Sequence, residues 1–550
     1  MIKNDNRRLA NVKTRHEAGL DYVKDNIVLN SPFSSNLIKE MKPYFPGDED
    51  ALMEHFDKLE QMVNFVVKAP KSVERISEFF MEMKDCRFSI TRASGNTLSA
   101  VEFFELKSLL IQMTRIRGEM ANVMEAGISI PDEYILEDVE NVLDILDPRH
   151  DRIHTFYVYD EFSPKLAEMR RKRKDLEKKA RKMQRATKDE IKHKYGITLT
   201  PKFDIVLSKS CTDYKIIDGI PELAMVGEDH LTASFELKPT PEALKIINEI
   251  EDITTEIEDE ELKVLEGLSK AIAKHTDVLL SNIDRIAALD LMMGRAIFAD
   301  EKKCVRPEIV KEHVIEFKNA RHLQVEEVLS SKGKKYKPIS MSLKSGVSCI
   351  TGANMGGKTI SLKLSGMIAL MAQYGFFVPC QEAKIGLSGY MQMLIGDSQS
   401  VERGLSSFGS EMEELKEILD NSVDRSMLLI DEIASGTNPV EGLALTRSLV
   451  DYLKDRPYIS LITTHFETVT EDEGVTNMQV RGLKGVDFSK LDKEIRYANR
   501  RERIDIIGKY MDYSLDVVKG NREVPKDALN IAKMLGINKE IIEGAQKYIK

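Results

Sequence analysis

The string TGANMGGKT, from Thr351 to Thr359, constrains the fold of this chain more than any other feature. It follows the phosphate-loop pattern of glycine, four residues, glycine, lysine and serine or threonine. The glycines let the backbone wrap closely enough for its N–H groups to point at phosphate oxygens, while the lysine adds charge and the threonine offers a hydroxyl to Mg²⁺. We therefore predict a nucleotide site that contains Gly352, Gly356, Gly357, Lys358 and Thr359.

The residues around this loop have the expected context. Val347–Thr351 forms an apolar run typical of a buried strand, and Thr359–Gln373 has the pattern of a helix. The positive end of such a helix faces the bound anion. The alternative is a glycine-rich turn between a strand and a helix without a ligand.

Length and composition limit the remaining possibilities. A chain of 550 residues is expected to form about two to four domains. Its 42% hydrophobic and 31% charged residues are typical of a soluble, helix-rich protein. We predict a cytoplasmic protein without a membrane partner, because no apolar run reaches a membrane span and the N-terminus lacks a signal-peptide core. The net charge of −10 argues against a globally basic surface for nucleic acid.

The region before the phosphate loop has a helical pattern. Residues 1–155 contain segments such as Ala51–Lys68 and Phe103–Met124, with apolar residues at helical spacing. Ser163 followed by Pro164 predicts the start of a helix in which basic residues accumulate. These residues could follow a phosphate backbone, or they could form a solvated arm with acidic neighbours. The candidates for DNA contact are Arg170, Arg171, Lys174, Lys178 and Arg181.

A second helical pattern extends from Pro241 to Ala299 without an interior proline. Its isoleucines at 246, 250, 253 and 257 have the spacing of a coiled-coil seam, and an unbroken helix of this length would extend roughly 80 Å. The two long helices suggest a projecting arm with a small tip. Residues 249–261 are strongly acidic, which would repel DNA if that surface faced it.

Strands alternate with helices in the last 250 residues, which predicts a mostly parallel sheet. Ser426–Glu432 is an apolar strand that ends in two carboxylates. Asp431 can hold the Mg²⁺ shell, while Glu432 can orient and polarise the attacking water. His465 follows the strand of Tyr458–Glu467, where its imidazole can donate to a γ-phosphate; a loop or core histidine is the alternative.

A helix is expected to start between Ser407 and Ser410. Ser410 and Glu413 also have the spacing of a capping box, so these serines could simply begin the helix. The order of parts favours a functional role. A phosphate loop, a serine-led helix, a carboxylate strand, a turn of small residues and Thr-Thr-His occur in this order in ABC-type ATPases.

Four strings together resemble the ATPase domain of the MutS family. They are TGANMGGKT, GLSSFGSEM, LLIDEIASGTNPVEGLAL and ITTHFET, where the family has TGPNMGGKS, STF, DEIGRGT and TTH. The resemblance implies a homodimer in which Ser407 of one subunit reaches the γ-phosphate held by the other. It also implies that Asn354 and Met355 line the nucleotide, that Tyr336 stacks near the adenine and that Asn438 belongs to a dimer-facing turn.

The fold class that follows is an α-helical lever or clamp region, then an α/β P-loop NTPase domain of ABC type with a helical C-terminal tail. We expect an N-terminal helical core at 1–155, an arm at 156–300, the ATPase domain at 301–520 and a dimerisation tail at 521–550. Asp160–Lys179 is similar to the start of the arm in the family branch that carries a small C-terminal nuclease domain.

Departures from the family pattern bear on the load of this ATPase, by which we mean the molecule that its ATP-driven movement acts on. No string near the N-terminus resembles the family's mismatch-reading domain, and we expect the nuclease domain to be missing as well. Mismatch recognition is therefore not predicted.

Two functions from different classes remain open. One is a DNA-handling clamp, which the basic residues of the arm favour. The other is an ATP-dependent reactivase for a cobalamin-dependent aminomutase, such as lysine 5,6-aminomutase, because the chain resembles short members of the family that are linked to this task. The acidic residues of the arm and the negative net charge favour this second function.

Overall fold

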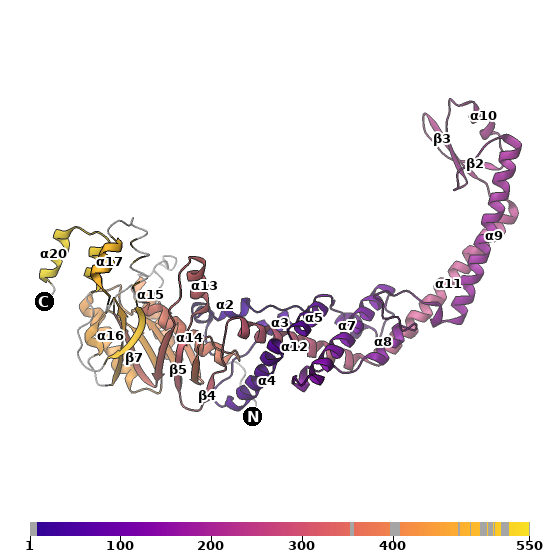
Figure 1. Cartoon of the computed structure of the whole chain (residues 1–550). Helices are drawn as coiled ribbons and strands as arrows, with labels where there is room; N and C mark the ends of the chain where they lie inside the picture. Colours follow the sequence, from indigo (N-terminus) through magenta and orange to yellow (C-terminus); the bar gives the residue numbers. More distant parts are fainter. Residues whose placement is uncertain are drawn as a thin grey trace. The chain divides into compact units, whose positions relative to one another are not determined.

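The computed structural model forms two compact units that are built from separate stretches of sequence (Figure 1). Unit 1 comprises Met1–Glu78, Glu119–Ile135 and Arg285–Lys550, and unit 2 comprises Phe79–Gly118 and Leu136–Asp284. The structure describes residues 8–352, 357–396, 407–470, 474–483, 486–495, 512–518 and 527–548, together with Arg503, Ile506 and Tyr510. The four-domain division stays a prediction.

The largest element of unit 1 is a six-stranded sheet with the order β13-β12-β7-β11-β10-β9. All neighbouring strands are parallel except β12 and β13, so the predicted, mostly parallel sheet is confirmed. The strands are β7 (Gly346–Thr351), β9 (Tyr390–Ile395), β10 (Ser426–Asp431), β11 (Ile459–Thr463), β12 (Val475–Gly482) and β13 (Asp512–Val518).

Both faces of this sheet are buried, which explains the continuous apolar runs of its strands. Within β10, Met427 and Leu429 contribute to one core, while Leu428 and Ile430 contribute to the other. Helix α14 (Lys358–Gln373) packs in the first core, and α15 (Ser407–Asn421) and α16 (Pro439–Lys454) pack in the second. The first core also includes a four-stranded sheet of β4 (Glu308–Val310), β8 (Glu382–Gly386), β5 (Val314–Ala320) and β6 (Ile339–Lys344).

The N-terminal segment belongs to the same core as the sheet. Its helices α1 (Val12–Glu17) and α2 (Leu20–Asp25) lie in a stretch that covers the edge strand β9. The N–H of Met391 donates to the carbonyl of Leu9 at 2.7 Å, and the N–H of Met393 donates to the Thr14 hydroxyl at 3.0 Å. These bonds satisfy backbone groups of β9 that would otherwise be open to pairing with another chain.

Helices account for most of the remaining chain. The segments predicted at Ala51–Lys68 and Phe103–Met124 are confirmed as α4 (Glu49–Lys68) and α7 (Ala100–Glu125). The other helices are α3 (Ser35–Lys39), α5 (Pro70–Met81), α6 (Arg87–Arg92), η1 (Asp132–Tyr134), α8 (Glu140–Leu146), η2 (Asp160–Phe162), α13 (Leu323–Ser331), η4 (Glu467–Thr470), α17 (Phe488–Ile495), α19 (Asp527–Met534) and α20 (Lys539–Tyr548). Within the described ranges, no helix combines the length and the apolar character that crossing a bilayer requires.

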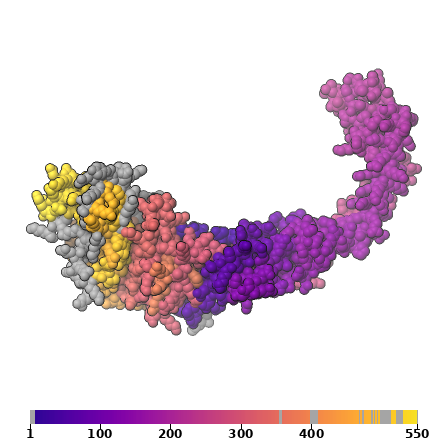
Figure 2. Space-filling view, in the orientation of Figure 1, coloured from indigo at the N-terminus to yellow at the C-terminus, as the bar shows by residue number. Residues whose placement is uncertain are grey.

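Unit 2 contains two long helices, α9 (Pro164–Tyr195) and α11 (Pro241–Ala273), which pack together as a narrow stem (Figure 2). The predicted start of α9 is confirmed, because the Ser163 side chain accepts a hydrogen bond from the N–H of Leu166. Ile253 and Ile257 are buried in the seam as predicted. The stem carries a small sheet of β1 (Asp204–Ser208), β3 (Thr232–Leu237) and β2 (Leu223–Glu228), with helix α10 (Thr212–Asp218) against it.

The prediction of an unbroken helix from Pro241 to Ala299 is wrong. Helix α11 ends at Ala273, and α12 begins at Thr276 and ends at Glu301. Between them, the N–H groups of Lys274 and His275 bond to carbonyls three residues earlier, and the Thr276 hydroxyl donates to the carbonyl of Ala273 at 3.0 Å. A threonine hydroxyl therefore replaces a backbone donor at the break, which a search for proline does not detect.

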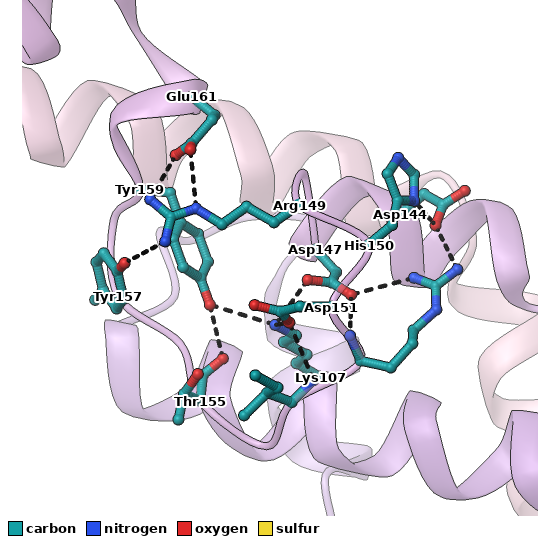
Figure 3. A network of polar contacts seen from close by, with 12 residues as sticks. Lys107, Asp144, Asp147, Arg149, His150, Asp151, Thr155, Tyr157, Tyr159 and Glu161 are labelled. Carbon is teal, nitrogen blue, oxygen red and sulfur yellow. Dashed lines mark hydrogen bonds and ion pairs between the residues drawn. The ribbon is translucent and has the colours of Figure 1, made fainter.

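A buried ion pair joins α7 to the loop that precedes the arm (Figure 3). Nζ of Lys107 lies 3.0 Å from Asp147 and 3.3 Å from the hydroxyl of Tyr159, and all three side chains are almost fully buried. Burial by itself lowers the pKa of Lys107, but Asp147 and Tyr159 outweigh it and hold the pKa above its usual value. His150 and Arg152 in this loop adopt left-handed backbone conformations, with φ of 53° and 55°.

Three histidines of unit 1, of which His322 is buried and His55 and His313 are half-buried, make its stability depend on pH. Burial lowers the pKa of His55, His313 and His322 to about 4, and nearby Arg295, Arg425 and Lys363 respectively act in the same direction. The pKa of an unfolded histidine is about 6.5, so between these values the unfolded chain binds more protons. The stabilisation is complete above pH 6.5 and is lost as pH falls towards 4.

We expect His322→Leu to reduce this pH dependence. Both ring nitrogens of His322 are buried without a hydrogen-bond partner among the described residues, so leucine removes no hydrogen bond. The measurement is the unfolding temperature between pH 7 and pH 4, with His230→Gln in an exposed loop as the control. An unchanged slope in His322→Leu would contradict the prediction.

Candidate functional site

Three neighbouring strands of the six-stranded sheet end at the candidate site. β10 ends at Asp431 and β11 at Thr463, and these two residues face each other in the parallel register. On the other side of β11, Thr463 is opposite Ile350, close to the end of β7. Because parallel strands present their carboxyl ends at one edge, Gly352, Lys358, Asp431, Glu432 and His465 all lie at this edge.

Lys358 lies at the centre of this edge. Its Nζ is 2.9 Å from the carbonyl oxygen of Gly352, 3.1 Å from Nδ1 of His465 and 3.1 Å from Oε1 of Glu432. Only 3% of the Lys358 side chain is exposed. Burial lowers its pKa, and Glu432 acts in the opposite direction. The ammonium group therefore already has an anionic partner in this structure.

Glu432 contacts both Lys358 and His465. Its second carboxylate oxygen lies 2.8 Å from Nε2 of His465. The hydrogen bond from His465 lowers the pKa of Glu432, and Lys358 lowers it further, while burial raises it. An ammonium group can only donate, so Nδ1 of His465 accepts from Lys358 and the proton on Nε2 is directed at Glu432.

Thr359 and Asp431 form a pair that suits Mg²⁺. The Thr359 hydroxyl donates to one oxygen of the Asp431 carboxylate at 2.8 Å. Hydroxyl and carboxylate oxygens are the hard ligands that Mg²⁺ prefers, together with water and substrate phosphates. These two side chains therefore fit the predicted metal site.

The glycines that the structure describes have the conformations that the loop requires. Gly352 has φ of 128°, and Gly357 precedes α14 in a left-handed conformation with φ of 79°. A Cβ at position 357 would lie 3.0 Å from the ring of Tyr513 on β13. The sequence analysis missed Tyr513, and no motif around it gave a signal, because only the antiparallel pairing of β13 with β12 brings it here.

Several predicted site residues lie outside the described residues. They are Asn354, Met355 and Gly356 of the phosphate loop, and the side chain of Ser407. Ser407 is the first residue of α15 that the structure describes, and Ser410 lies in the first turn of the described helix. The alternative that these serines simply begin the helix therefore stays open. Asn438 caps α16, because its side chain accepts a hydrogen bond from the N–H of Val440.

Tyr336 lies in the segment between α13 and β6. Burial raises the pKa of its hydroxyl to about 12, and the backbone of His322 partly offsets the effect. A contact with adenine stays a prediction for this residue.

The five basic candidates on α9 have different environments. Arg170 is used within unit 2, because its guanidinium lies 2.5 Å from Asp160 and 2.6 Å from Glu261. Lys178 pairs with Asp175 at 3.3 Å on the exposed face. The other three, Arg171, Lys174 and Arg181, are exposed, and no ion pair to them occurs among the described residues of unit 2.

The acidic stretch of α11 provides partners for the basic helix. Lys172 lies 3.2 Å from Glu249, and Lys165 lies 3.5 Å from Glu260. These pairs also show that α9 and α11 run antiparallel. Part of the acidic stretch is therefore directed at α9, which reduces the repulsion that the sequence alone suggested.

Comparisons with known proteins identify relatives of the chain. Residues 348–550 match the family model described as MutS domain V. A protein named Endonuclease MutS2 from Shouchella clausii is 29% identical over 416 residues, which cover 72% of this chain and 51% of the relative. The DNA mismatch repair protein MutS of Aquifex pyrophilus is 24% identical over 513 residues, which cover 90% of this chain and 56% of the relative.

A further Endonuclease MutS2, from Carboxydothermus hydrogenoformans, is 31% identical over 306 residues, or 54% of this chain and 35% of the relative. The chain thus spans between about a third and just over half of the length of these relatives. The matched residues include β10, β11, α14 and all but the first two residues of β7, and these elements carry the candidate site.

Proposed function

Because residues 348–550 make this chain a member of the MutS family of ATPases, we propose that it binds ATP with Mg²⁺ and hydrolyses ATP to ADP and phosphate. The observation that carries the proposal is the meeting of Lys358, Glu432 and His465 beside the Thr359–Asp431 pair. A buried lysine, a metal-binding pair and a carboxylate next to a histidine are the groups that phosphoryl transfer to water requires.

The roles of the residues follow from their chemistry. The backbone of the phosphate loop and Lys358 bind the phosphates, and Thr359 with Asp431 holds the metal. Bound Mg²⁺ neutralises charge on the phosphate oxygens. Glu432 orients the attacking water and accepts its proton. Since Glu432 contacts Lys358 in this structure, the carboxylate has to exchange the ammonium for water when phosphate reaches Lys358.

We propose that the working form is a homodimer. The family resemblance implies that Ser407, the first residue of α15, completes the site of the other subunit. In the tail, the exposed side chains of Ile541 on α20 (63%) and Ile537 just before it (48%) are available for contact with a second subunit.

We propose DNA as the load of this ATPase. The names of the relatives, an endonuclease and a DNA mismatch repair protein, support DNA. Within unit 2, Arg171, Lys174 and Arg181 lie exposed on the outer side of α9 and suit contact with a phosphate backbone. Arg170 is left out of this surface, because it pairs with Asp160 and Glu261.

Substitution of this surface tests DNA as the load. The triple variant Arg171→Gln, Lys174→Gln and Arg181→Gln is expected to weaken DNA binding and to reduce the slope of log affinity against log salt by about 2 to 3, since each phosphate contact contributes ~0.9. The matched control replaces Lys263, Lys270 and Lys274 of the same unit by glutamine, which removes equal charge. Binding is measured at 50 to 200 mM salt. Equal slopes in the two triple variants would contradict the proposal that Arg171, Lys174 and Arg181 contact DNA.

Reactivation of an aminomutase stays a separate prediction. ATP turnover with DNA, compared with turnover and recovery of activity in an inactivated aminomutase, separates the two loads. Stimulation by the aminomutase alone would overturn the proposal of DNA.

A further inference from the structure

Thr463 lies on β11 opposite Asp431 and contacts both carboxylate residues of the site, Asp431 and Glu432. Its hydroxyl donates to one oxygen of Asp431 at 2.5 Å and accepts from the N–H of Glu432 at 3.0 Å. The side chain is fully buried at the end of β11. The Thr463 hydroxyl therefore donates a hydrogen bond to the Asp431 side chain and accepts one from the backbone of the next residue, Glu432.

The backbone at Glu432 needs this support. Glu432 has φ of 45°, a left-handed conformation that residues other than glycine seldom adopt. Its N–H is held by the carbonyl of Thr463 at 3.1 Å as well as by the hydroxyl. The turn directs the Glu432 carboxylate at His465 and Lys358. Strained backbone of this kind persists only where the surroundings fix it.

Two hydroxyls hold the Asp431 carboxylate, and they are expected to behave differently when Mg²⁺ binds. Thr359 donates to one of its oxygens and Thr463 donates to the other. When Mg²⁺ binds, the Thr359 hydroxyl is expected to turn to the metal, as the proposed function requires. The Thr463 hydroxyl does not face this change, so it can keep the orientation of the Asp431 carboxylate throughout.

We infer that Thr463 is a positioning residue for ATP hydrolysis, which sets the metal-binding carboxylate and the water-orienting carboxylate with one hydroxyl. The inference rests on the proposed function. It assigns a task to the first threonine of ITTHFET, which the sequence analysis treated only as part of a motif. Partners that orient metal ligands typically contribute 10- to 100-fold to metal affinity or activity.

Thr463→Val, which has a similar shape without the hydroxyl, tests the inference. We expect turnover to fall by about 10- to 100-fold and the Mg²⁺ concentration for half-maximal turnover to rise by about tenfold or more. Thr463→Ser keeps the hydroxyl and is expected to restore both values to within about threefold of the original chain. A loss of folded protein alone would lower turnover without moving the Mg²⁺ dependence.

Thr446→Val is the matched control, because Thr446 is a buried threonine of the same unit whose hydroxyl donates to the carbonyl of Gly442 within α16. Its Mg²⁺ dependence is expected to be unchanged. If Thr463→Val does not fold, Thr463→Ala replaces it in the same comparison. Unchanged turnover and Mg²⁺ dependence in the folded Thr463 variant would overturn the inference.

The unsubstituted chain and Glu432→Gln separate the two levels of the argument. If the unsubstituted chain hydrolyses ATP and Glu432→Gln does not, while Thr463→Val is normal, only the role of Thr463 fails. If the unsubstituted chain does not hydrolyse ATP, the proposed function fails first. If Glu432→Gln hydrolyses ATP normally, the water-orienting role of Glu432 fails, and with it the part of the inference that concerns Glu432.

Discussion

Glu432→Gln is expected to slow ATP turnover by about 10²- to 10⁴-fold while ATP stays bound. Glutamine keeps the shape of the side chain but cannot accept a proton from the attacking water. Lys358 also loses its anionic partner at 3.1 Å, so the affinity for a non-hydrolysable ATP analogue should rise. Single-turnover hydrolysis and filter binding of labelled ATP measure the two effects separately.

A matched control removes a different carboxylate from a lysine pair in unit 1. Glu382 lies 2.6 Å from Lys318, and both side chains are about two-thirds exposed. Glu382→Gln is expected to leave turnover and analogue affinity unchanged. Normal turnover in Glu432→Gln would remove Glu432 from the role of orienting the water.

Lys107→Met is expected to destabilise unit 2 by about 3–5 kcal/mol, because it leaves the Asp147 carboxylate buried without its ammonium partner. Asp147 is 0% exposed and keeps only its contacts with Arg152 and the surrounding loop. The second substitution Asp147→Asn should recover part of the loss, since no charge then remains to be buried. Urea unfolding followed by hydrogen exchange of residues 100–118 and 140–162 reports on this unit directly.

Lys84→Met provides the comparison, because Lys84 pairs with Glu105 at 2.9 Å on the surface of the same unit. Lys84 is 66% exposed, and exposed pairs contribute only about 0–1 kcal/mol. Equal losses in Lys84→Met and Lys107→Met would mean that the buried pair has no special weight. Such a result would also remove the Lys107–Asp147 pair as the tie between α7 and the loop before the arm.

The site could be predicted to the extent that it is built from short stretches of chain. The glycines, Lys358 and Thr359 follow one strand directly, and Asp431 ends another, so their spacing indicates where they lie in a parallel sheet. Their catalytic roles stay predictions. Thr463 was not singled out, because a threonine in a buried strand looks like any β-branched residue until the register places it opposite Asp431.

The spacing of apolar and charged residues could not predict contacts between residues that are far apart in the chain. The basic run on α9 predicts a charged helix, but it does not indicate that Arg170 pairs with Glu261, 91 residues away. Nor does the N-terminal pattern indicate that Leu9 bonds to Met391 and enters the core of the sheet. Helical spacing identifies an apolar face, and many different surfaces could cover that face equally well.

The sequence by itself determined the strands that carry the carboxylates, the helix after the phosphate loop and the helical character of the arm, because each depends on residues close together in the chain. It did not determine the break after Ala273. Only the tertiary structure decided which basic side chains stay exposed, where the N-terminal segment packs and that Glu432 forms an ion pair with Lys358. These features depend on contacts between distant residues. Such contacts form only when the sheet register and the helix pairing bring the residues together.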